Sequence, residues 1–186
     1  MVFLLQSLTN LFLIALLLRV YLQWLRVSLL NPFAQFIVKL TDFIVLPLKR
    51  LISDIFLINL VILALVIVLQ FVTTLAWYGL QGFPFAVAGS GVLPGFLILS
   101  LVALLVLICH MLIGLVLISA ILSLVDPFSV HAASFEAMTA PLLRPFRQVL
   151  PLLGNIDLSP MAFVLLCQLI DVYPLAQLGL WANSLI

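Results

Sequence analysis

Charged residues are scarce in this 186-residue chain. Asp, Glu, Lys and Arg make up only 7% of it and leave a net charge of +1, whereas a soluble domain carries about 25% charged residues. So few charges cannot solvate a water-exposed surface or form the basic face that binds nucleic acid. The composition therefore excludes an ordinary soluble domain and a nucleic-acid-binding module.

Residues that carry chemistry are also few. Both cysteines, Cys109 and Cys167, lie inside apolar runs and predict no disulfide framework. The sequence contains no glycine-rich phosphate loop, Cys/His metal pattern or nucleophile elbow. We therefore expect a protein that is not an enzyme and that holds no metal or cofactor. The amino terminus lacks a basic segment and a cleavage motif, so we expect the first span to stay in the mature protein.

What the chain does contain is long apolar runs. Hydrophobic residues make up 67% of it, and the mean hydropathy is +1.46. A helix that crosses the hydrocarbon core, which is roughly 30 Å thick, needs about 20 apolar residues. Four segments meet this requirement: 3–25, 55–78, 95–124 and 160–183. The sequence predicts an all-α membrane protein with four transmembrane helices.

A polar sequence motif, or phrase, occurs twice in the chain and divides these spans into two pairs. The first copy is Asn31-Pro32-Phe33 with Pro47-Leu48-Lys49-Arg50, and the second is Asp126-Pro127-Phe128 with Arg144-Pro145-Phe146-Arg147. Because an internal repeat indicates a repeated structural unit, we expect two parallel hairpin repeats. They occupy residues 1–80 and 95–186, and a Gly/Pro-rich outer loop at 81–94 joins them.

Each repeat also contains a predicted amphipathic helix between its two spans, at 31–47 and 126–140. Apolar residues recur at three-and-four spacing there, so both helices are expected to lie along the membrane surface. We expect Asp126 to cap the second helix and Pro127 to begin it. The prolines that follow should end it, and its longer phrase is interpreted as about one extra helical turn.

The basic residues predict the orientation. Six of the seven lie in or beside the two connections that carry the phrases, so these connections should be cytoplasmic. Both termini and the 81–94 loop should then be periplasmic, in a bacterial inner membrane. In this interpretation Lys49, Arg50, Arg144 and Arg147 fix the topology, and binding of anionic lipid is their alternative role.

Two charged residues fall inside the predicted spans, namely Arg19 and Asp171. An unpaired charge at membrane depth costs at least roughly 2.5–3.5 kcal/mol, so we hypothesise an ion pair between them that joins the repeats. Alternatively, Arg19 extends toward Arg26 at the surface while Asp171 stays neutral and hydrogen-bonded.

Uncharged polar residues form a second intramembrane pattern. Asn10, Gln70 and His110 each lie about 22 Å from the cytoplasmic end of their span, near the level of Gln168 and Asp171. Such a layer could relay protons or cations, or it could join the helices through hydrogen bonds worth roughly 0.6 kcal/mol each. A single intramembrane histidine argues against stable haem binding by a monomer, although a dimer or an assembly protein could hold haem transiently.

The second connection ends in the segment Gly154-Asn155-Ile156-Asp157-Leu158-Ser159-Pro160. We interpret Asp157 as a residue that helps to start the fourth helix rather than as a catalytic carboxylate. Pro160 marks the expected first turn of that helix.

The chain resembles the YggT family of small integral membrane proteins, which includes the cyanobacterial and chloroplast YlmG relatives. The resemblance rests on Leu17-Leu18-Arg19-Val20 with Trp24, on the two phrases and on the 154–160 segment. The resemblance covers nearly the whole chain and implies no catalytic activity. Bacterial members are linked to osmotic and ion homeostasis, and plastid members to cytochrome assembly and nucleoid organisation.

Two functional hypotheses follow. The first is that the chain is an accessory, scaffold or assembly factor for a membrane complex. Alternatively, it serves ion transport or osmotic and potassium homeostasis through the polar midplane layer. Under either hypothesis we expect it to form a homo-oligomer or to be a subunit of a larger membrane complex.

Overall fold

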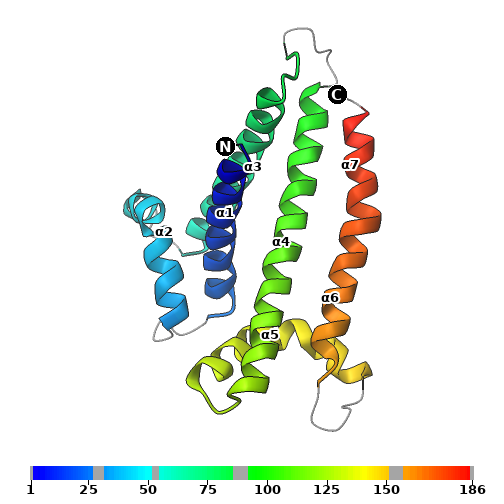
Figure 1. Ribbon diagram of the computed structural model, residues 1–186. Helices are drawn as coiled ribbons and strands as arrows, with labels where there is room; N and C mark the ends of the chain where they lie inside the picture. The colour runs from blue at the N-terminus through cyan, green and yellow to red at the C-terminus, as the bar shows by residue number, and fades with distance from the viewer. Residues whose placement is uncertain (1, 27–31, 52–54, 86–91, 151–156, 185–186) are drawn as a thin grey trace. The chain divides into compact units, whose positions relative to one another are not determined.

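The computed structural model describes residues 2–26, 32–51, 55–85, 92–150 and 157–184 (Figure 1). These ranges consist of helices and turns and contain no strand. Four helical stretches are long and apolar enough to cross a membrane: Leu4–Trp24, Phe56–Leu80, Val92–Val125 and Ser159–Asn183. The predicted all-helical, multi-pass fold is therefore confirmed. Its division into two hairpin repeats stays a prediction.

The helices in chain order are α1 (Val2–Trp24), α2 (Pro32–Leu51), α3 (Ile55–Leu80), α4 (Val92–Val125), α5 (Val130–Val149), α6 (Ser159–Ile170), the π-helical η1 (Asp171–Leu175) and α7 (Ala176–Asn183). The chain forms two compact units, which are described separately here. The first contains residues 1–108 and 175–186, and the second contains residues 109–174. The predicted domain limits, which separate 1–80 from 95–186, stay a prediction.

In the first unit, α1 packs against both α2 and α3. Ile58, Ile62 and Val66 of α3 are at most 5% exposed, and Leu13 and Leu16 of α1 are fully buried. Apolar residues three or four positions apart lie on one face of a helix, which is how these helices find each other. Many other apolar side chains of α1 and α3 are exposed, as expected of helices whose outer faces meet lipid.

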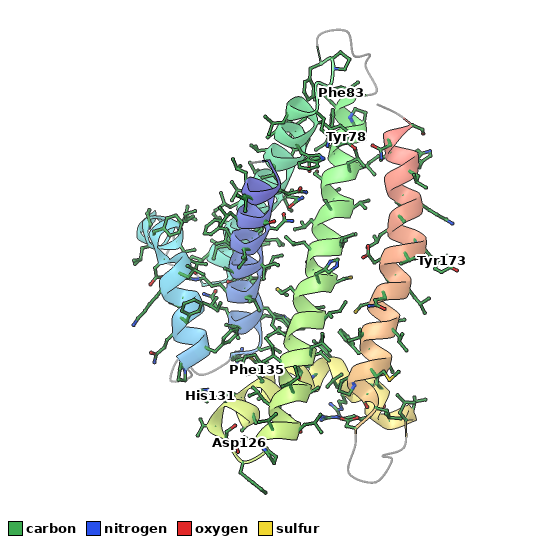
Figure 2. The ribbon with its side chains drawn as sticks, in the orientation of Figure 1. Tyr78, Phe83, Asp126, His131, Phe135 and Tyr173 are labelled. Atoms are coloured by element: carbon green, nitrogen blue, oxygen red, sulfur yellow. The ribbon has the colours of Figure 1, made fainter. Side chains whose placement is uncertain are left out.

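An aromatic cluster connects the end of α3 to the start of α4. Phe96 is fully buried, and its ring centroid lies 5.0, 5.4 and 5.6 Å from those of Tyr78, Phe83 and Phe85. Figure 2 shows Tyr78 and Phe83 together at this end of the unit. The chain turns there at Gly82, whose φ of +82° favours glycine. The outer loop thus begins as a packed turn.

In the second unit, α5 packs against α6. Val116, Leu143, Phe163 and Cys167 form its buried core. The ring of Phe146 meets that of Phe163 edge to face at 5.8 Å, a favourable aromatic geometry. Residues from α4, α5 and α6 therefore share one apolar core.

The second amphipathic helix begins later than predicted. Its N-cap is Ser129, whose Oγ accepts a hydrogen bond from the backbone N–H of Ala132 at 3.1 Å. Asp126 and Pro127 lie in the turn after α4 instead. Because α2 and α5 both contain 20 residues, the longer second phrase adds residues to this turn and no helical turn.

Both amphipathic helices continue through their prolines, so the predicted ends at residues 47 and 140 are wrong. Pro47 lies inside α2, and Pro141 and Pro145 lie inside α5. Each proline removes one backbone hydrogen bond. In α5 the residues around them, Leu143 and Phe146, pack into the core of the second unit, and this packing offsets the loss.

The last span is not a regular α-helix throughout. A π-helical turn, η1, begins at Asp171 and contains Pro174. Proline has no N–H to donate to the carbonyl four residues earlier, so a wider turn is a common accommodation. Hydropathy alone does not register this proline, so residues 160–183 were predicted to form one continuous helix.

Candidate functional site

Arg19 of α1 is buried with its charge, at 1% exposure. Its Nη1 donates to Thr41 Oγ1 at 2.7 Å and to the carbonyl of Val38 at 3.1 Å. Its Nη2 lies 2.8 Å from Oδ1 of Asp42. This last contact is an ion pair by distance, because neither Nη2 nor Nε makes a hydrogen bond within the described residues. Helix α2 thus supplies two hydrogen-bond acceptors and the carboxylate that face the buried guanidinium.

Asp42 supplies the carboxylate that the sequence analysis assigned to Asp171. Asp42 lies within the predicted amphipathic helix at 31–47, and its role as a partner of Arg19 was not predicted. Its acidic character and its place on the helix that follows the first span were the available clues. Asp171 belongs to the second unit, where it begins η1. The Arg19–Asp171 pair stays a hypothesis, and the burial of Arg19 no longer requires it.

Thr41 and Thr139 hold matching positions in α2 and α5. Both are fully buried, and each Oγ1 donates to the carbonyl one turn earlier, at 2.7 and 3.0 Å. Thr41 Oγ1 accepts a hydrogen bond from the charged Arg19, whereas Thr139 Oγ1 lies 3.1 Å from the neutral hydroxyl of Ser119, with which it forms a hydrogen bond. The same position therefore has a charged partner in one unit and a neutral partner in the other.

The match extends along both helices at a constant interval of 98 residues. The buried residues that correspond are Ala34, Ile37, Thr41 and Val45 in α2, and Ala132, Phe135, Thr139 and Leu143 in α5. Each threonine also precedes a helical proline by six residues. This spacing was visible in the sequence and would have located both buried threonines.

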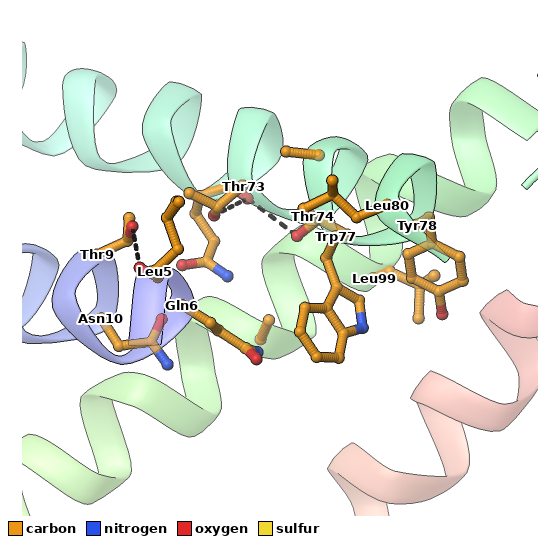
Figure 3. A pocket seen from close by; sticks show the side chains of 13 residues that line it. Leu5, Gln6, Thr9, Asn10, Thr73, Thr74, Trp77, Tyr78, Leu80 and Leu99 are labelled. Atoms are coloured by element: carbon orange, nitrogen blue, oxygen red, sulfur yellow. Dashed lines mark hydrogen bonds between the residues drawn. The ribbon is translucent and has the colours of Figure 1, made fainter. Parts of the chain in front are cut away.

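A pocket of about 240 Å³ opens between α1, α3 and the first turns of α4 (Figure 3). Its polar lining includes Gln6, Thr9, Asn10, Gln70 and Thr73, and none of the described residues that line it is charged. The structure thus brings together Asn10 and Gln70, two of the four residues of the predicted polar layer. Gln6 was missed because it lies too near the helix end to be noticed as an intramembrane polar residue.

The other two residues of the predicted layer, His110 of α4 and Gln168 of α6, belong to the second unit and have exposed side chains. Within the described ranges, no group of three or more His, Cys, Asp or Glu side chains is placed to hold a metal ion. The predicted layer of four polar groups stays a hypothesis.

A charged cluster holds the start of α6 in the second unit. Arg147 Nε donates to Asp157 Oδ2 at 2.8 Å, and Asp157 Oδ1 accepts the backbone N–H of Ser159 at 2.8 Å. Glu136 Oε1 lies 3.5 Å from Arg147 Nη1. Partial burial raises the pKa of Asp157, but hydrogen bonds from Ser159 and the bond and charge of Arg147 outweigh it, so this pKa lies below its ordinary value. Pro160 occupies the first turn of α6.

The remaining phrase residues lie on or beside the surface helices. Pro32 and Phe33 open α2, the side chain of Arg144 is exposed, and Phe128 is 97% exposed in the turn before α5. Asn31, Gly154 and the side chains of Lys49 and Arg50 lie outside the described part of the chain.

Comparison with known proteins places the chain in a family. The sequence pattern of the CCB3/YggT family matches residues 1–80 and 98–178. An uncharacterised protein of Pseudomonas aeruginosa is 36% identical over 96% of this chain and 89% of its own length. The uncharacterised protein YggT of Escherichia coli K12 is 34% identical over 91% of this chain and 86% of its own length. An uncharacterised protein of Haemophilus influenzae is 29% identical over 94% of this chain and 92% of its own length. No solved structure gives a significant match. The family pattern, the coverage of these relatives and the four apolar helices agree: the chain belongs to the CCB3/YggT family of membrane proteins.

Proposed function

We propose that this chain is a non-enzymatic, multi-pass protein of a bacterial inner membrane that acts as an accessory, scaffold or assembly subunit of a larger membrane complex. The observation that carries the proposal is an uncovered apolar stripe on α2. Phe36, Leu40 and Phe43 follow one another at helical spacing and are 61%, 41% and 66% exposed.

This stripe belongs to a helix whose opposite side is already occupied. Ala34, Ile37 and Val45 are buried where α2 packs against α1. Phe43 makes one ring contact, with Phe12 at 5.4 Å between centroids, and remains exposed. Leaving three large apolar side chains in water is unfavourable. Lipid or an apolar helix of a partner therefore covers this stripe, and a scaffold would use it to hold that partner.

The correspondence between α2 and α5 supports the two-repeat architecture within this proposal. Equal length and matching buried positions are the expected result of an internal duplication. Both helices would then lie at the cytoplasmic leaflet with both termini periplasmic, as the basic residues indicate. Arg144 is exposed and makes no ion pair with any described residue, unlike Arg147, so it is available to an anionic lipid headgroup.

The test is the composition of the native complex. The full chain is extracted in mild detergent, and the mass and subunits of its complex are determined by native mass spectrometry. A scaffold gives stoichiometric foreign subunits. The double variant Phe36→Ser/Phe43→Ser should lose them because it removes the apolar contact, and the control Lys39→Ser, on the same helix, should keep them.

Two results would contradict the scaffold role. One is a pure monomer in mild detergent. The other is a complex whose foreign subunits survive the Phe36→Ser/Phe43→Ser change. A pure homo-oligomer would instead favour the second candidate function below.

The second candidate is ion transport or osmotic homeostasis through the polar layer. Its supporting observation is that Asn10 and Gln70 line one pocket. Among the described residues that line this pocket there is no Asp, Glu, Lys, Arg or His, so this candidate has less support than the first. Loss of a pH- or cation-dependent flux in Asp171→Asn and His110→Ala variants that still fold would support it. Unchanged flux in both variants would contradict it.

A further inference from the structure

The pocket between α1, α3 and α4 extends from the membrane surface toward its interior. Trp77 and Leu80 line its outer end, and Gln70 lines its inner end. At 1.5 Å per residue, Gln70 lies about 15 Å from Leu80 along the axis of α3, toward the start of that helix. Tryptophan is enriched at the headgroup level of membranes. The pocket therefore spans the depth at which lipid headgroups give way to acyl chains.

The side-chain oxygen of Gln70 has no hydrogen-bond partner among the residues that the structure describes. The residue is 7% exposed, and this oxygen, Oε1, is buried. A buried amide oxygen without a partner costs about 1–3 kcal/mol. Replacement partners are harder to find in a bilayer than in water, because the hydrocarbon core contains no water. An acceptor held at this cost indicates that the pocket receives a hydrogen-bond donor.

The other polar groups of the pocket also offer acceptors. Thr9 donates its hydroxyl proton to the Leu5 carbonyl at 2.8 Å, and Thr73 and Thr74 donate theirs to the Gln70 carbonyl at 2.9 Å. Their oxygens keep lone pairs that can accept a bond. In Figure 3, Gln6 and Trp77 lie beside the same space. The lining thus combines several acceptors with an apolar and aromatic wall.

The ligand class follows from charge and volume. A cation would need a carboxylate or many oxygens to replace its water, and no charged residue is among the described residues that line the pocket. An anion would find no cationic side chain among them and would be repelled by the unpartnered Gln70 Oε1. At about 240 Å³ the pocket is smaller than the roughly 300–1,000 Å³ of drug-sized sites. A small, uncharged group that carries hydroxyl donors fits each of these conditions.

We propose that this pocket binds an uncharged hydroxyl-bearing group such as glycerol, either free or as the headgroup of a neutral lipid, through Gln70 Oε1. The hydroxyls donate to Gln70 and to the threonine oxygens, and the carbon backbone packs on Trp77. The proposal is independent of the scaffold role, because it uses none of the α2 stripe.

The test follows Trp77 fluorescence in the purified full chain. Trp24→Phe and Trp181→Phe, both at exposed positions, leave Trp77 as the single tryptophan. The detergent is lauryldimethylamine oxide, which carries no hydroxyl that would compete. The probes are glycerol, monooleoylglycerol, methyl oleate as a matched lipid without hydroxyls, and oleylamine as a cationic lipid.

The decisive variant is Gln70→Leu, with Gln168→Leu as a matched control at an exposed position. We expect monooleoylglycerol to shift the Trp77 emission in the parent and the control, and to bind about tenfold more weakly to Gln70→Leu. Without ligand, Gln70→Leu should melt at or above the parent's temperature, because it removes an unpaired buried amide. An amide with a purely structural role would make that variant melt lower.

The probes also identify the source of the ligand. A shift with both glycerol and monooleoylglycerol supports a free polyol, and a shift with monooleoylglycerol alone supports a lipid headgroup. Equal shifts with methyl oleate, tighter binding of oleylamine, no response to any probe, or unchanged affinity in Gln70→Leu would each overturn the proposal.

Discussion

Nη2 of Arg19 lies 2.8 Å from Oδ1 of Asp42, and this contact explains how the first span accommodates a buried cation. The guanidinium has 0% side-chain exposure, whereas the carboxylate has 30%. Arg19 is thus covered by the helix that follows its own span along the chain. The charge of Arg19 would be unfavourable in a membrane span without a partner, but here it joins α1 to α2.

The first prediction concerns this ion pair. Asp42→Leu should lower the free energy of unfolding by about 1–3 kcal/mol, because it leaves Arg19 buried with neutral partners. The expected cost is below the roughly 3–5 kcal/mol of a fully buried pair, since Asp42 keeps partial exposure. The double variant Arg19→Met/Asp42→Leu should lose less than the sum of the two single changes.

Unfolding in mixed micelles of mild detergent and sodium dodecyl sulfate measures these energies as a double-mutant cycle. Lys39→Leu serves as the control, because this exposed cation of α2 has no ion pair in the described part of the chain. Additive losses from the two single changes would show that Arg19 and Asp42 do not interact.

The second prediction compares the two buried threonines. Thr41→Val removes an acceptor from the charged Arg19 and should cost about 1.5–3 kcal/mol. Thr139→Val removes a bond to the neutral hydroxyl of Ser119 and should cost about 0.5–1.5 kcal/mol. Each change keeps the volume of the side chain, so the same unfolding measurement compares the bonds directly. The reverse order would show that the charge on Arg19 does not strengthen its bond to Thr41.

The third prediction concerns pH and Asp157. Its folded-state pKa is lowered, so the stability it contributes is present above its unfolded value of about 3.9 and is lost as the pH falls through the folded value. The melting temperature should therefore fall on acidification below about pH 4. Asp157→Asn should remove this component of the pH dependence.

Glu136→Gln is the matched control for this titration. Its side chain is 63% exposed and lies 3.5 Å from Arg147, so solvent screens the contact and its loss should have little effect. If Asp157→Asn and the parent melt with the same pH profile between pH 3 and 6, the Arg147–Asp157 bond does not stabilise the start of α6.

The fourth prediction tests the orientation. In a background of Cys109→Ala and Cys167→Ala, single changes Lys39→Cys, Arg144→Cys and Gln81→Cys introduce thiols at exposed positions. An impermeant maleimide should label Gln81→Cys in cells whose outer membrane is permeabilised. The other two should react only after the inner membrane is opened. Labelling of Lys39→Cys in intact spheroplasts would reverse the proposed topology.

The sequence sufficed where the physical cause is local. The four predicted spans are confirmed as helices. They could be predicted because crossing a bilayer requires a run of apolar residues, and such a run is visible in the sequence without knowledge of tertiary contacts. The helix ends were harder to predict. Ser129 caps α5 in place of Asp126, and α5 continues through Pro141 and Pro145, because burial of Leu143 and Phe146 outweighs a local preference to stop.

In the candidate site, too, the sequence identified the polar residues but not their partners. The sequence identified Arg19 as a buried charge that needs a partner, and Asn10 and Gln70 as intramembrane polar residues. It suggested Asp171 as the partner, because that is the other charged residue inside a predicted span, and it did not consider Asp42, which lies in a predicted surface helix. It also could not show that Gln70 would lack a partner in a pocket, since that depends on every side chain around it.

By itself, then, the sequence determined that this protein is a helical membrane protein of one family, because hydropathy and the order of the phrases are properties of the chain alone. Only the tertiary structure decided that Arg19 meets Asp42, that Thr139 meets Ser119 and that Gln70 Oε1 remains unpaired. The physical reason is that a hydrogen bond or ion pair requires a distance of about 3 Å, which packing between helices sets and hydropathy does not.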